Sequence, residues 1–417
     1  MFFYLIFEVI SIVIGIFALC IFLLHLARQK TVHTIIQKKG IYIPFFLTLL
    51  AFFAGFLSNK TYAPDFAMPA FMHSHAPGGL PPSIPFSKII NFFMSEKDLE
   101  KISDIGRDPN TVPNLPENPN EDGVIKISLT TKEVVSEIAP GIFFNYWTFD
   151  RQVPGPMLRV REGDTIELTL TNDASSLHDH NIDLHAVTGP GGGAVLTHVA
   201  PGETKTFRWK ALNPGLFVYH CAMPNVSTHN SHGQYGLILV EPKEGLSKVD
   251  KEFYLMQGEL YTVGQLGKKG LVAFDSEALL SGNPNYVVFN GKVEGLPRMK
   301  AKVGDKIRIF VGNGGVNLIS SFHVIGEIFD TVYPNASMGG AVEHNTQAAQ
   351  VLPGGASIVE FTLDVPGKFL IVDHALARMN KGAWAVLEVS GDEDPEIFSR
   401  VESGMETKGG VEHGHLD

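Results

Sequence analysis

The chain has 417 residues, 44% of them hydrophobic, which is enough for two ordinary domains and further segments, because single cores rarely grow beyond roughly 250 to 300 residues. Charged residues are only 18% and the formal net charge is −11, so we expect no basic surface and no nucleic-acid partner. The two cysteines, Cys20 in an apolar run and Cys221 in a different setting, exclude a disulfide framework and leave Cys221 available for other chemistry.

The first segment, residues 1–58, is predicted to be a transmembrane helical hairpin. Residues 2–26 and 41–57 are apolar, and the first of these runs is long enough to cross a bilayer. The connection "ARQKTVHTIIQKKG" is basic and should stay on the cytoplasmic side, which places the rest of the chain on the periplasmic side of the inner membrane. A cleaved signal peptide is the alternative, but the N-terminus has no basic region and the apolar run is too long.

Residues 59–123 are predicted to be a linker, since they are rich in proline and polar residues. Within it, residues 86–102 have apolar residues near helical spacing, which predicts a short amphipathic helix. This helix would lie either on the membrane surface or against the domain that follows. The linker histidines His73 and His75 are interpreted as solvated side chains.

From residue 124 the sequence changes to short alternating runs separated by glycine and proline, which is typical of β-sandwiches. "VREGDTIELTLTN" parallels "AKVGDKIRIFVGN", and "FRWKALNPGLFVYHC" parallels "VEFTLDVPGKFLIVDH", which indicates an internal duplication. We therefore predict an all-β fold of two tandem Greek-key β-sandwiches, residues 124–246 and 247–391. A polar tail, residues 392–417, follows them.

Histidines gather around Cys221 in "HNIDLH" and "YHCAMPNVSTHNSHGQYG". A thiolate, two imidazoles and a weak axial group are the ligands of a trigonal blue-copper (type 1) site. His180, Cys221 and His229 supply the first three, and Gln234 falls at the axial position.

The remaining histidines predict a second metal site. Residues an odd number apart on a strand point to opposite faces, so His185 and His220 should point away from the first copper. His374 ends the strand of the second sandwich that corresponds to the one before Cys221. Three imidazoles with an open fourth position make a catalytic site.

These motifs resemble the two-domain copper-containing nitrite reductases over nearly all of both sandwiches, which implies cupredoxin-like domains. The stretches that carry the resemblance are "NYWTFDRQVPGPMLRVREGDTIELTLTN", "DHNIDLHAVTGPGGGA", "GLFVYHCAMPNVSTH", "YGLILVEPKEGL", "LISSFHVIGEIFD" and "VDHALARMNKGA". The resemblance implies that type 1 copper receives electrons and passes them to type 2 copper, where nitrite is reduced by one electron to nitric oxide.

The resemblance also implies roles for individual residues. His185, His220 and His374 would hold the type 2 copper, with His374 coming from a neighbouring subunit of a homotrimer. Asp183 and His323 would deliver protons, and Ile325 would shape the nitrite pocket. His178, His198, His232 and His344 are interpreted as ordinary core or surface residues.

Gln234 stands where members of this family usually carry methionine. An amide oxygen is a harder donor than a thioether and should favour Cu(II), which lowers the reduction potential. We therefore hypothesise that membrane quinol is the electron donor, directly or through a membrane partner, in place of a soluble cupredoxin or cytochrome.

Two alternatives have other functions. A laccase-like multicopper oxidase needs more HxH motifs than this chain has, and alanine follows Cys221 where such oxidases usually have histidine. A membrane-anchored blue-copper electron carrier would have no use for Asp183, His323 or His374.

Overall fold

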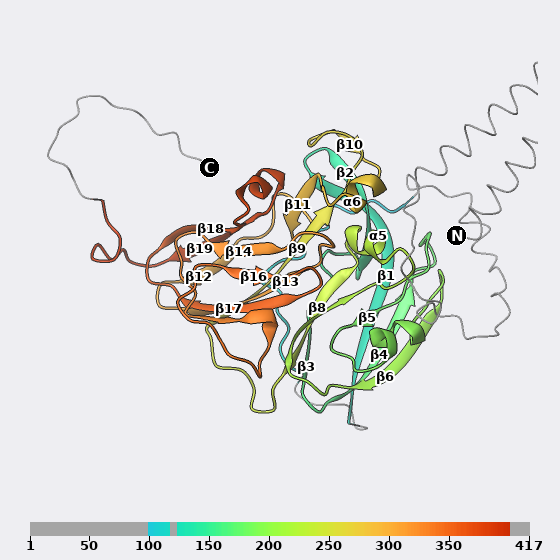
Figure 1. The fold of residues 1–417 in the computed structure, drawn as a ribbon, viewed down its shortest axis with the longest axis horizontal. Helices are drawn as coiled ribbons and strands as arrows, with labels where there is room; N and C mark the ends of the chain where they lie inside the picture. Colours follow the sequence, from blue (N-terminus) through green and yellow to red (C-terminus); the bar gives the residue numbers. More distant parts are fainter. Residues whose placement is uncertain (1–98, 117–122, 401–417) are drawn as a thin grey trace, which may run out of the picture.

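The computed structural model describes residues 99–116 and 123–400, which are coloured in Figure 1. The predicted hairpin at 1–58, His73, His75 and most of the predicted amphipathic helix lie outside the described residues. Of the helices that are described, none combines the length and the apolar character needed to cross a membrane.

The first sandwich is built from β1 to β8. In β4 every second residue is buried, as expected for a strand with one face on a core. Two sheets result, with orders β10-β2-β1-β4-β6 and β3-β8-β7-β5. The strands are β1 (Val124–Ala139), β2 (Ile142–Phe149), β3 (Leu158–Arg161), β4 (Thr165–Asn172), β5 (Asp183–Leu184), β6 (Thr204–Lys210), β7 (Gly215–His220) and β8 (Tyr235–Glu241), joined by β10 (Gly270–Leu271) from further along the chain.

The second sandwich follows with sheets of order β11-β9-β13-β17-β15 and β12-β19-β18-β14-β16. Its strands are β9 (Lys251–Leu260), β11 (Tyr286–Phe289), β12 (Met299–Lys302), β13 (Lys306–Asn313), β14 (Ser320–Val324), β15 (Thr331–Tyr333), β16 (Ala349–Val351), β17 (Ala356–Thr362), β18 (Gly367–Asp373) and β19 (Trp384–Ser390). The short helices of the described chain are η3 (Pro190–Leu196), α5 (Val226–Ser231), α6 (Ser276–Leu280), η4 (Pro334–Ala336) and η5 (Leu376–Lys381).

Strand pairing confirms the predicted duplication. β1 runs parallel to β4, and β9 runs parallel to β13 in the same way. β3 pairs with β8 as β12 pairs with β19, both parallel. The antiparallel pair β7 and β8 corresponds to β18 and β19. β18 is therefore the counterpart of β7, the strand that leads into Cys221.

A third core joins the two sandwiches. Each sandwich has its own apolar interior, and Tyr146, Leu237, Tyr254 and Phe310 belong to a separate cluster made by strands of both. Figure 1 shows the two sandwiches side by side, with β8 and β9 adjacent where they meet. This shared core fixes the position of one sandwich against the other.

The described end of the linker is tied to both sandwiches. Ile105 is fully buried. The amide of Ile102 donates a hydrogen bond to the carbonyl of Val135 in the first sandwich (3.0 Å). In the second sandwich, the amide of Tyr254 donates to the carbonyl of Pro109 (2.8 Å). The last residues of the predicted amphipathic helix are not helical, since Lys101 forms a β-bridge with Val135 instead. Backbone pairing with β1 replaces the helical hydrogen bonds at this point.

Candidate metal centre

The backbone around Cys221 brings its predicted partners to it. β7 ends at His220, and the amide of Cys221 donates to the carbonyl of Gln234 (3.1 Å) just before β8 begins. Between these two strands, α5 carries His229. His180 comes from a separate segment, bridged to Val199.

The four donor groups converge in the interior. Cys221 Sγ lies 3.3 Å from His229 Nδ1 and 3.9 Å from His180 Nδ1. Gln234 Oε1 lies 3.2 Å from His229 Nδ1. Donor atoms that share one first-row metal ion are roughly 3 to 4 Å apart, given bonds of about 2.0 to 2.3 Å. The cluster therefore has the dimensions and the donor set of a type 1 copper site.

Burial prepares these groups for a metal ion. Removal from water raises the pKa of the Cys221 thiol to about 12 and lowers the pKa of His229 well below its usual value. The imidazole is thus neutral and able to coordinate. Only a cation makes the buried thiolate favourable.

Gln234 is buried and holds its oxygen in the cluster, while its Nε2 has no hydrogen-bond partner among the described residues. Gly233 before it has a φ of +110°, and a Cβ there would lie 2.5 Å from Val153 Cγ2. Glycine is therefore required for the turn that presents Gln234.

A second cluster lies on the other side of the same residues. His185 Nε2 is 3.1 Å from His220 Nε2, and Asp183 Oδ2 is 4.0 Å from His220 Nε2. Partial removal from water, and then the neighbouring His220, lower the pKa of His185. A pair of imidazoles beside a carboxylate suits a metal that binds an anion.

The strand expected between His180 and His185 is shorter than predicted, since β5 covers only two residues. The two histidines nevertheless lie in different clusters. The bridge between His180 and Val199 fixes His180 where strand pairing does not.

The run "GPGGGA" forms η3 and supports Asp183. Gly192 has a φ of +55°, and a Cβ there would lie 1.9 Å from Asp183 Oδ1. No side chain other than that of glycine leaves room for this carboxylate. Spacing in the sequence did not predict this contact with the site.

The remaining predicted residues lie in the second sandwich. His323 on β14 and His374 after β18 have ring centroids 5.2 Å apart, and His323 Nδ1 donates to the carbonyl of Gln347. Ile325, two residues after His323, is 42% exposed. His374 is exposed and is not part of the cluster of Asp183, His185 and His220 within one chain. Figure 1 shows β18, which precedes His374, in the second sandwich at the left and β5 in the first sandwich at the right.

Comparisons with known proteins give the family. A family model described as Multicopper oxidase matches residues 135–245. The copper-containing nitrite reductase of Neisseria meningitidis serogroup A is 51% identical over 280 residues, covering 66% of this chain and 72% of that protein. The protein of the same name from Rhizobium meliloti is 34% identical over 302 residues, covering 67% and 79%. The chain belongs to the copper-containing nitrite reductases.

The solved structures agree with this assignment. The copper nitrite reductase from Nitrosomonas europaea has a TM-score of 0.58 and 35% identity, covering 66% of this chain and 96% of that one. Copper is therefore the metal of this nitrite reductase, and the thiolate and imidazole donors around Cys221 fit it. In the described part of the chain, groups of three or more metal donors occur only at these two clusters.

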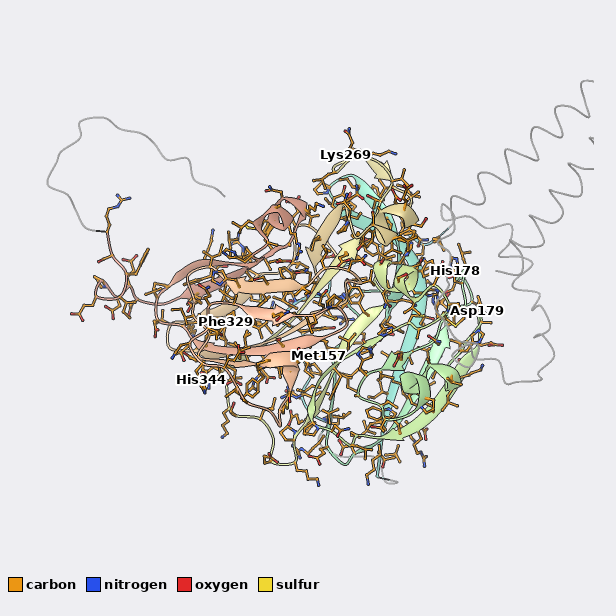
Figure 2. All side chains as sticks on the ribbon, in the orientation of Figure 1. Met157, His178, Asp179, Lys269, Phe329 and His344 are labelled. Carbon is orange, nitrogen blue, oxygen red and sulfur yellow. The ribbon has the colours of Figure 1, made fainter. Side chains whose placement is uncertain are left out.

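Four further histidines of this nitrite reductase have protein partners that belong to neither donor cluster. His198 pairs with Asp179 (3.0 Å), and the Nδ1 atoms of His232 and His344 donate to backbone carbonyls. His178 bonds to a carboxylate of β1. Figure 2 shows His178 and His344 on opposite sides of the molecule, so these side chains do not form a third centre.

Three residues of the copper-binding region were not predicted. Asn181 Oδ1 accepts from the amide of Ala222 (2.7 Å) and lies 3.5 Å from Cys221 Sγ. Its position directly after His180 in the sequence could have indicated that it lies near the site. The Trp147 ring lies edge-on to that of His229, with centroids 4.5 Å apart. Glu133 lies behind His180. Both come from strands distant in sequence, which no spacing rule connects to the site.

Proposed function

We propose that this protein reduces nitrite to nitric oxide and water, with electrons entering at the type 1 copper and nitrite binding at the type 2 copper. Membership of the copper-containing nitrite reductases supports the reaction. The observation that carries the proposal is the bond between two adjacent residues: His220 belongs to one donor cluster and Cys221 to the other. An electron therefore has a short covalent path between the sites.

Bound copper supplies the one-electron chemistry and a positive centre for the anion. The protein supplies the two protons that the reaction consumes. Asp183, at 4.0 Å from His220 Nε2, is positioned to hydrogen-bond an anion at the second cluster. We assign His323 as the second proton donor: the carbonyl of Gln347 accepts its Nδ1–H, which leaves Nε2 to take up a proton and pass it to the substrate. Ile325 would form an apolar wall beside it.

The reaction is tested by adding nitrite anaerobically to the reduced holoprotein and following nitric oxide with an electrode, alongside metal analysis. We expect nitric oxide and two coppers per chain. Four coppers with oxygen reduction would favour the laccase-like oxidase, and one copper without nitric oxide would favour the electron carrier.

We also propose a homotrimer in which each type 2 site is completed by a neighbouring chain. His185 and His220 form one half site in the first sandwich, and His374 is exposed beside His323 in the second. A third imidazole from another copy would give the open tris-histidine site that catalysis needs. A closed ring of identical contacts is a common solution for homo-oligomers.

Mixing two defective variants tests this arrangement. His185→Ala and His374→Ala proteins should each lose type 2 copper. After joint refolding of equal amounts, about three quarters of randomly assembled trimers contain both variants. Each of these trimers has one complete type 2 site out of three, so about one quarter of the type 2 copper should return. If mixing restores none, the site is not shared between chains.

We further propose that the enzyme is anchored in the inner membrane by residues 1–58, with its catalytic sandwiches in the periplasm, and that it draws electrons from quinol. The apolar runs and the basic connection between them support the anchor. The buried Gln234 oxygen beside His229 supports a low potential and hence a reducing donor.

Full-length protein in vesicles should turn over nitrite with a quinol analogue. No turnover with quinol, together with rapid turnover with a soluble cupredoxin, rejects this donor.

A further inference from the structure

The side of His180 that faces away from Cys221 has an unusual environment. Nδ1 points toward the thiol, and Nε2 is fully buried without a partner at hydrogen-bond geometry among the described residues. The charged atom beside it is Glu133 Oε1, at 3.5 Å. A buried N–H group without an acceptor destabilises the folded protein.

Glu133 lies on β1 and its side chain is fully buried. Its Oε1 accepts from the amides of Leu177 and His178, both at 2.8 Å, and from His178 Nδ1 at 3.0 Å, whereas its Oε2 has no partner among the described residues. The Oε1 atom therefore lies at the meeting point of this backbone segment and the His180 ring, within 3.5 Å of Nε2.

A purely structural role would be to fasten the segment at Leu177 and His178 to β1. One neutral oxygen is sufficient for that, because backbone amides need only an acceptor. The carboxylate adds a buried charge and a second oxygen. Its Oε1 lies 3.0 Å from His178 Nδ1 and 3.5 Å from His180 Nε2. A structural role alone therefore leaves both the unpartnered Oε2 and the approach of Oε1 to His180 Nε2 unexplained.

We propose that Glu133 is a positioning residue of the type 1 copper site, which accepts the Nε2–H of His180 and lowers the reduction potential of the copper. A histidine that coordinates through Nδ1 carries its hydrogen on Nε2, so that atom becomes a donor in need of an acceptor. A carboxylate in this position fixes the tautomer and makes the imidazole a stronger electron donor. Cu(II) benefits more than Cu(I) from such a ligand. The inference rests on the proposed function only for the presence of type 1 copper.

His178 competes with His180 for the same oxygen. Its side chain is 45% exposed, and its ring stacks on Trp147 with centroids 4.3 Å apart. Removing the Nδ1–H of His178 should leave more of the carboxylate charge to His180. The structure thus provides two substitutions with opposite expected effects.

The experiment measures the type 1 potential of the holoprotein by spectroelectrochemistry, without nitrite. In Glu133→Gln, the ratio of Cu(I) to Cu(II) affinity should rise by about tenfold, which raises the potential by about 59 mV for a one-electron couple. Type 1 absorption should persist. Glu133→Asp, which keeps the charge at a greater distance, should give a smaller rise.

The matched control is Glu259→Gln, a carboxylate that is 1% exposed in the second sandwich and bonded to the amide of Leu318. It should lower thermal stability and leave the potential unchanged. An unchanged potential in Glu133→Gln, or one equal to that of the control, overturns the proposal.

If Glu133→Gln does not fold, His178→Phe decides the question, since its ring can still stack on Trp147. A lower potential supports the proposal, and an unchanged one overturns it. Because nitrite is absent from these measurements, failure of nitrite reduction in the parent protein would count against the proposed function alone.

Discussion

A Cys221→Ser protein is expected to fold and to bind one copper per chain. Its rate of nitrite reduction, measured with a donor that acts through type 1 copper, should fall more than about 100-fold below that of the parent. Second-shell changes at metal sites typically cost about 10- to 100-fold, and this change removes a ligand itself. Sγ lies within 3.9 Å of both histidine donor atoms, and no other thiol is present among the described residues to replace it. Metal analysis, the visible spectrum and the nitric oxide rate measure the three effects.

His232→Phe is the control for this substitution. His232 is also buried and close to α5, but its Nδ1 donates to the carbonyl of Thr228 (2.7 Å) and its ring stacks on Trp147 and Phe144. A phenyl ring can keep the stacking, so type 1 absorption should remain. A Cys221→Ser protein that retains this absorption or the parental rate would show that Cys221 is not the thiolate ligand.

The sequence predicted those parts of the molecule that depend on local spacing. The alternation of apolar and polar residues predicted the strands. The two pairs of similar sequence stretches predicted the duplication, in which β7 and β18 occupy corresponding positions. The distance in sequence from Cys221 to His229 and Gln234 is short, so one hairpin and one helical turn bring all three together. The donor cluster of type 1 copper was therefore accessible without a structure.

Features that depend on contacts between distant segments were not accessible in this way. Glu133 is one of several polar residues on β1, and only the packing of the segment near His178 against that strand makes it a neighbour of His180. The closeness of Gly192 to Asp183 appears only when η3 folds back on β5. His374 is not part of the cluster at His185 within one chain, and the proposed shared site would need a second chain, which single-chain geometry does not supply.

Further residues hold the candidate ligands in place. Asn181 joins His180 to the backbone after Cys221. On the other sandwich, buried Asp373 accepts from the amide of Ala375 (3.1 Å) and pairs with Arg378, which fixes the turn that carries His374. Rigid second-shell contacts of this kind keep donor atoms in place before a metal arrives.

An Asp183→Asn protein is expected to keep both coppers and to lose about 10²- to 10⁴-fold in kcat for nitrite reduction, the range of a lost general acid. The two side chains have nearly the same shape, so asparagine fits the space that Gly192 leaves. The amide cannot release a proton to the substrate as a carboxyl group does. His185 and His220 remain 3.1 Å apart and able to bind the metal.

Asp173→Asn is the matched control, because this carboxylate follows β4 and is bound by Ser175 and Lys132, away from both clusters. Its kcat should equal that of the parent. The type 1 spectrum and the rate of type 1 reduction should be unchanged in Asp183→Asn, which separates a proton defect from an electron defect. Should Asp183→Asn turn over nitrite at the parental rate while retaining both coppers, the protons must come from another group, and His323 would then be the first to replace.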